Sequence, residues 1–66
     1  MSNRFNPGDA VCFISKHGGF ENGIVKSYGH LIGTVFVVYN CSGDWHNYEN
    51  YTAALTPEDS LVSGWR

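Results

Sequence analysis

Long apolar runs and a charged leader are both missing from this chain. Its 66 residues contain no stretch of about 18 apolar residues, the length a membrane span needs. No charged start is followed by an apolar segment, so we expect neither a signal peptide nor a membrane span, and we predict a cytoplasmic protein. The two cysteines, Cys12 and Cys41, are too few for a disulfide scaffold of the secreted kind. We expect both to be free thiols in or beside apolar strands.

Basic residues are also scarce. Four residues are Lys or Arg against six that are Asp or Glu, and the formal charge is −2. The four are scattered along the chain as Arg4, Lys16, Lys26 and Arg66. Duplex binding usually requires a basic face that neutralises several phosphates. The composition therefore argues against a sequence-specific DNA-binding protein.

The sequence carries no catalytic or metal-binding signature. The three histidines, His17, His30 and His46, fall on different predicted loops or strands, and neither cysteine lies in a recognisable motif. A nucleophile needs a base and an orienting partner, and a metal needs convergent ligands. We therefore expect a protein that is not an enzyme and that binds no metal and no cofactor.

What the sequence does contain is turn chemistry between alternating strands. The Asn6-Pro7-Gly8-Asp9 turn leads directly into an alternating strand with no helix in between. Strands are predicted over residues 10–15, 23–28, 31–39 and 45–51, with a short strand around Leu55, and residues 21–23 are predicted as a turn or bulge. One helical turn is predicted over 51–54, and another begins at Thr56 as its cap, with Pro57 in the first helical position.

These elements predict an all-β fold, a small barrel of about five short antiparallel strands with one helical turn near the C-terminus. We predict one domain over residues 5–66, with a frayed N-terminus over residues 1–4.

Alternation assigns the strand faces. The predicted core consists of Val11, Phe13, Val25, Val35, Val37 and Tyr39, with Leu55 and Leu61 closing the ends. The opposite face is also apolar, and contiguous exposed apolar surface usually marks a contact site. We therefore predict that the protein forms a homo-oligomer through Ile14, Ile24, Phe36 and Val38, which share that face with Cys12. The alternative is that residues 61–62 and Trp65 cover part of this face within the chain.

Residues 44–51 are chemically the richest segment. If they form a strand, Trp45 and Asn47 face one way, and His46 and Tyr48 face the other. Aromatic side chains with polar groups supply contact area and hydrogen bonds together. The predicted binding residues are Trp45, His46, Asn47, Tyr48 and Tyr51, with Lys16 and His17 of a nearby loop. The alternative is that Trp45 and Tyr51 only cap a small core.

Several short motifs suggest a family. They are Phe5-x-x-Gly8-Asp9-x-Val11, Gly23-Ile24-Val25, the strand over 35–39, and Tyr51-Thr52-Ala53-Ala54-Leu55. With them the chain resembles the SH3-like barrel class, which includes translation-factor and Tudor-type barrels. It is similar to the plasmid-borne type II dihydrofolate reductases, and it resembles small phage and prophage proteins with the pattern of residues 43–54. The reductases' Val-Gln-Ile-Tyr segment is replaced here by residues 46–50. The resemblance implies a barrel that oligomerises, without reductase activity.

Two functions are compatible with these observations. The first is an interaction module of a phage or mobile element that binds a protein or peptide through residues 45–51. The second is a weak nucleic-acid-binding barrel that uses the aromatic residues together with Lys16 and Lys26. A minor alternative is the binding of a pteridine-type small molecule in a pore on an oligomer axis.

Overall fold

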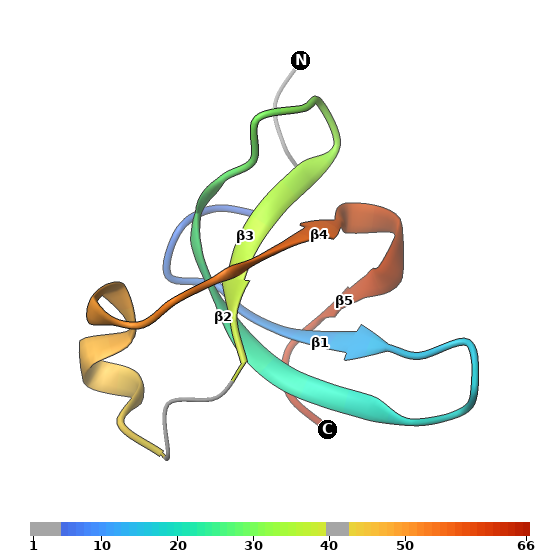
Figure 1. Ribbon diagram of the computed structural model, residues 1–66. Coiled ribbons are helices and arrows are strands. Elements are labelled where there is room, and N and C mark those ends of the chain that lie inside the picture. The colour runs from blue at the N-terminus through green and yellow to red at the C-terminus, as the bar shows by residue number, and fades with distance from the viewer. Residues whose placement is uncertain (1–4, 40–42) are drawn as a thin grey trace.

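The computed structural model describes residues 5–39 and 43–66, which form one antiparallel sheet of five strands (Figure 1). The elements are β1 (Ala10–Ile14), β2 (Phe20–Tyr28), β3 (Thr34–Val38), the 3₁₀ helix η1 (Trp45–Asn50), β4 (Ala54–Pro57), the 3₁₀ helix η2 (Glu58–Ser60) and β5 (Leu61–Ser63). The strand order is β4-β3-β2-β1-β5. The long β2 pairs with β1 through its first half and with β3 through its second half. The predicted all-β fold of about five short antiparallel strands is confirmed, and a short helical turn, η2, lies near the C-terminus. The predicted frayed residues 1–4 lie outside the described residues.

The turn before β1 forms as its residues predict. The Asp9 carboxylate accepts a hydrogen bond from the Asn6 backbone N–H (2.9 Å), and the Asp9 N–H donates to the Asn6 carbonyl (3.0 Å). Gly8 has a φ of 94°, which glycine adopts without the steric cost that a side chain would add. The Gly8 N–H also donates to the carbonyl of Val25, so the turn is fixed to β2.

The start of β2 differs from the prediction. Residues 21–23 were expected to form a turn or bulge, but β2 begins at Phe20 and runs through them. Gly23 serves close packing here: a Cβ atom on it would lie 2.6 Å from Val37 Cγ1 and 2.8 Å from the Val38 carbonyl oxygen. A glycine inside a strand can mark a close approach between two elements. The sequence-based prediction treated this glycine as a turn signal and therefore placed a turn here.

The β2–β3 connection is longer than predicted. The strand expected over 31–39 begins only at Thr34. Gly33 has a φ of 83°, and the Thr34 N–H and hydroxyl both donate to the carbonyl of Leu31, at 3.2 and 2.7 Å. These bonds close a turn that places Leu31 and Ile32 at the surface.

The core contains most of the side chains that alternation predicted. Val11, Val25, Val35 and Val37 are fully buried and pack with Phe5 and Leu61, while Phe13 and Tyr39 are half-buried against them. The prediction for Leu55 is wrong: it pairs with Phe36 on the outer face and is 44% exposed.

The residue after Leu55 takes the inward place. Thr56 lies opposite Val35, is buried, and its Oγ1 lies 2.8 Å from the Tyr39 hydroxyl. Thr56 therefore belongs to β4 and does not cap the following helical turn, which begins one residue after Pro57.

The outer face is partly covered by the chain itself. Cys12 and Val38 have no exposed surface, so the assignment of Val38 to an exposed interface is corrected. The Trp65 indole donates to the Gly23 carbonyl, and the Asn22 side chain exchanges two hydrogen bonds with the backbone of Arg66. Residues 65–66 thus lie against β2, in agreement with the part of the alternative that concerns Trp65, whereas Leu61 belongs to the core.

The rest of the predicted interface is divided. Ile24 and Phe36 are half-buried, while Ile14 is 37% exposed and lies opposite the exposed Phe20 on the β1–β2 hairpin. Cys12 is a free buried thiol, as predicted, and Cys41 lies outside the described residues. Among residues 5–39 and 43–66, no helix is long and apolar enough to span a membrane.

Candidate functional site

The predicted binding segment is a helix. Residues 45–50 form η1, so the predicted strand over 45–51 is wrong, and the predicted helical turn over 51–54 is replaced by extended backbone at Tyr51. A 3₁₀ helix has three residues per turn, so residues three apart share a face. Trp45, Tyr48 and Tyr51 have this spacing and are half-buried, whereas His46 and Asn47 are exposed. The predicted pairing of His46 with Tyr48 on one solvent face is therefore wrong. The three-residue spacing of Trp45, Tyr48 and Tyr51 could have indicated the 3₁₀ helix, but the prediction assumed the two-residue period of a strand.

Asp44 fixes this helix. Its carboxylate accepts hydrogen bonds from the Asn47 side-chain amide (3.0 and 3.1 Å) and from the Tyr51 hydroxyl (3.0 Å). Its carbonyl accepts a further bond from the Asn47 backbone N–H. The polar groups of Asn47 and Tyr51 thus hold η1 in its conformation.

Trp45 also has a partner within the chain. Its ring lies 5.0 Å from that of Trp65, centroid to centroid, at an interplanar angle of 47°. The two indoles connect η1 to residues 65–66 across the outer face. Trp45 therefore caps the fold, which was the alternative considered from the sequence.

Lys16 and His17 are not brought to this helix. Both are exposed in the turn between β1 and β2, where the His17 N–H donates to the Ser15 hydroxyl at 3.1 Å. Figure 1 shows this turn at the opposite side of the molecule from η1. The structure thus separates the predicted binding residues into two groups.

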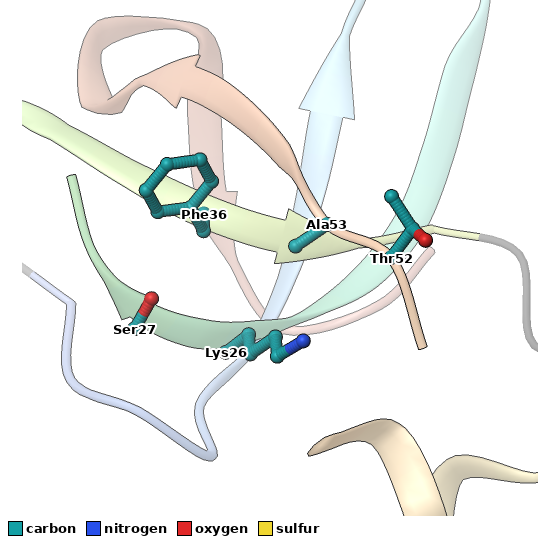
Figure 2. Close-up of a pocket in the computed structure, with 5 residues that line it drawn as sticks. All are labelled: Lys26, Ser27, Phe36, Thr52 and Ala53. Carbon is teal, nitrogen blue, oxygen red and sulfur yellow. The ribbon is translucent and has the colours of Figure 1, made fainter. Parts of the chain in front are cut away.

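A hollow of about 380 Å³ opens between β2, β3 and the segment before β4, and we call it the Phe36 hollow. Figure 2 shows its lining residues, Lys26, Ser27, Phe36, Thr52 and Ala53. A β-bulge forms one wall: Val25 pairs with Val37 and Ser27 pairs with Phe36, so Lys26 is the extra residue of β2. A bulge disturbs alternation, and here it places the consecutive Lys26 and Ser27 on the same hollow.

Two contacts hold the walls of the Phe36 hollow. The Lys26 ammonium donates to the Tyr51 carbonyl at 2.8 Å and so ties β2 to the end of η1. The Phe36 ring meets His30 edge-to-face, with centroids 5.2 Å apart at 84°. Leu55, which pairs with Phe36, is exposed, and so are Leu31 and Ile32 in the turn that follows His30.

A second hollow, of about 330 Å³, adjoins β4, and we call it the Tyr39 hollow. It is lined by Phe13, Glu21, Tyr39, Ala54, Leu55, Thr56 and Pro57. The Phe13 and Tyr39 rings pack edge-to-face, with centroids 6.1 Å apart. Burial raises the pKa of the Tyr39 phenol above its ordinary value of 10.0, the hydrogen bond with Thr56 lowers it, and the nearby Glu21 charge raises it again.

The histidines and acidic residues of the described chain are dispersed over the fold. Within the described ranges 5–39 and 43–66, no three residues of the types His, Cys, Asp and Glu are grouped so as to hold a metal ion. His30 packs on Phe36, His17 lies in the β1–β2 turn, and His46 is exposed on η1. The three histidines thus occupy three different places in the fold.

Comparisons of the chain with protein-family models, with curated proteins and with solved structures found no match. The resemblance to type II dihydrofolate reductases and to phage proteins therefore stays a prediction. Of the residues lining the Phe36 hollow, Ser27 had no signal in the sequence. Thr52 and Ala53 were noted only as part of the motif over 51–55, and Lys26 and Phe36 for other reasons.

Proposed function

We propose that this chain is a non-enzymatic interaction module that binds a peptide segment of a protein partner in the Phe36 hollow. One observation carries the proposal. In β3, Val35, Val37 and Val38 are fully buried, but Phe36 turns its ring toward an open hollow that also holds an ammonium group and two hydroxyls (Figure 2). An aromatic side chain beside a few polar groups is typical of a binding surface.

The location differs from the one expected from the sequence. The aromatic residues of η1 face the fold, and Asn47 and Tyr51 are bonded to Asp44. The role of η1 in this proposal is to shape the Phe36 hollow, since the Tyr51 carbonyl holds the Lys26 ammonium. His46 is exposed on η1 and is not among the residues that line the hollow.

Self-association is the second candidate function, and the exposure of the β2–β3 turn favours it. Ile32 is 91% exposed, and its neighbour Leu31 is 67% exposed. Contiguous apolar exposure of this kind marks a contact between proteins. Sedimentation velocity over a range of concentrations tests it: an Ile32→Glu variant is expected to remain monomeric where the wild type dimerises. A wild type that is monomeric throughout excludes this candidate.

Selection from a random peptide library tests the proposed function. The immobilised wild type is expected to enrich a consensus peptide, and Phe36→Thr is expected to weaken its binding by about tenfold or more, as truncation of an aromatic anchor does. The matched control is Phe20→Thr, the same change at an exposed strand position on the β1–β2 hairpin. It should leave the affinity unchanged.

The same assay separates a peptide from a nucleic acid. Binding that neutralises phosphates falls steeply with salt, whereas contact with an aromatic ring changes little. If no consensus emerges, or if Phe20→Thr is as damaging as Phe36→Thr, the proposal is wrong. If a labelled oligonucleotide binds with a steep salt dependence, the nucleic-acid alternative replaces it.

A further inference from the structure

The β-bulge at Lys26 gives the Phe36 hollow a polar end and an apolar end. Lys26 and Ser27 stand side by side on β2, and Figure 2 shows Lys26 extending along the strand while the Ser27 hydroxyl points toward the Phe36 ring. Thr52 and Ala53 form the facing wall. The hollow therefore combines one cation and two hydroxyls with an aromatic ring and a methyl group.

The polar end has donors to spare. A lysine ammonium has three N–H donors, and one of them is used by the Tyr51 carbonyl. Among the described residues, no hydrogen bond engages the hydroxyl of Ser27 or of Thr52. No Asp or Glu lines the hollow, so the Lys26 charge is not neutralised there by a carboxylate of the chain. Spare donors beside a positive charge favour an anionic group.

We propose that the Phe36 hollow binds the C-terminal residue of its peptide partner, an inference that rests on the proposed function. The terminal carboxylate accepts hydrogen bonds from Lys26 and Ser27, and the last side chain, an apolar one, packs against Phe36 and Ala53. A volume of about 380 Å³ is at the small end of ligand pockets and suits a single terminal residue.

Other anions fit this arrangement less well. A phosphate group carries up to two negative charges, and the lining holds only one basic side chain. An Asp or Glu side chain brings a carboxylate without the apolar group that Phe36 would receive. A chain terminus ending in Leu or Phe supplies both groups from one residue.

Titration with short capped peptides, followed by the amide resonances of the isotope-labelled chain, tests this inference. Acetyl-Ala-Leu with a free carboxylate should shift the resonances of Lys26, Ser27, Phe36 and Thr52. Its C-terminal amide should bind about tenfold more weakly, because hydrogen bonds to the charged group are lost. Acetyl-Ala-Ser with a free carboxylate should also bind more weakly, since its side chain does not fill the apolar end.

Variants locate the effect. Lys26→Met should remove the difference between the acid and the amide, and Lys16→Met, the same charge change in the β1–β2 turn, should preserve it. If Lys26→Met proves unstable because the bond to Tyr51 is lost, Ser27→Ala provides a second reduction of carboxylate binding without any change of charge.

Three results would overturn this inference: equal binding of acid and amide, binding of acetate or inorganic phosphate as tight as that of the peptide, or resonance shifts confined to other residues. These results are distinct from a failure of the proposed function. Suppose that peptides bind with an affinity that depends on Phe36 but show no preference for a free carboxylate. The proposed peptide-binding function would then be supported, and the inference of a C-terminal residue in the hollow would be refuted.

Discussion

The indole Nε1 of Trp65 donates a hydrogen bond of 2.8 Å to the carbonyl oxygen of Gly23, a residue 42 positions earlier in the chain. The same indole contacts Trp45 of η1. Together the two contacts bring three separate segments to the outer face of the sheet, the face on which Cys12 and Val38 are fully buried. The outer face is thus covered by Trp45 and Trp65 near Gly23, whereas the hollow beside Phe36 is open to solvent.

Removal of the Trp65 indole should expose Cys12. In a Cys41→Ser background, we expect Trp65→Ala to speed the reaction of the Cys12 thiol with a disulfide reagent under native conditions, because reaction requires access to the thiol. The control is Leu31→Ala, which truncates a side chain that is already 67% exposed. Unchanged labelling kinetics in Trp65→Ala would show that other residues protect Cys12.

Glycine at position 23 should be required for packing. Gly23→Ala places a methyl group against Val37 and the Val38 backbone, so we expect the free energy of unfolding to fall by about 1–3 kcal/mol. Gly19→Ala is the matched control, since no atom lies within 4 Å of its Cβ position and its φ is not positive. Urea unfolding of the two variants measures the difference. Equal stabilities would contradict the close approach of β2 to β3.

Ionisation of Tyr39 should destabilise the fold at high pH. Because folding raises the pKa of this phenol, the folded state holds the proton more tightly than the unfolded state does. Its contribution to stability is complete below the unfolded-state pKa of 10.0 and is lost as the pH rises through the higher folded-state pKa.

Tyr39→Phe isolates this contribution. At neutral pH the variant should lose about 1 kcal/mol with the hydrogen bond to Thr56. Above pH 10.0 the deficit should shrink, because the variant has no phenol to ionise at this position. Urea unfolding from neutral to alkaline pH gives both values. A constant difference across that range would contradict the raised pKa.

Asp44 should be required for η1. Asp44→Ala removes the hydrogen bonds to the Asn47 amide and the Tyr51 hydroxyl, so we expect faster hydrogen exchange in residues 45–51 and a loss of about 1–2 kcal/mol in stability. Glu49→Ala, at an exposed position of the same helix, is the control and should change stability by less than about 0.5 kcal/mol. Equal effects of the two variants would show that Asp44 does not hold the helix.

Sequence reasoning was successful where a local rule decides the structure. The 6–9 turn follows from its residue types, and alternation of valines correctly predicted that Val11, Val25, Val35 and Val37 form the core. It failed where two rules compete. Trp45, Tyr48 and Tyr51 fit a period of three, but the strand propensity of aromatic residues favoured a period of two.

The candidate site was harder to predict because it depends on long-range geometry. A bulge is not visible in the residue types around Lys26, yet it changes which way Ser27 faces. Thr52 and Ala53 reach the hollow from a segment 25 positions further along the chain, through pairing of β4 with β3. Val38 was assigned to an open face because the path of residues 65–66 across that face cannot be read from strand alternation.

Mapping of a selected peptide onto the labelled chain tests the central claim most directly. On titration of the wild type with the consensus peptide from the library, we predict that the largest amide shifts fall on Lys26, Ser27, Phe36, Thr52 and Ala53, and that Phe36→Thr abolishes them while Phe20→Thr does not. Shifts concentrated on the exposed side of η1 around His46, or in the Lys16–His17 turn, would contradict the account and place the binding surface elsewhere.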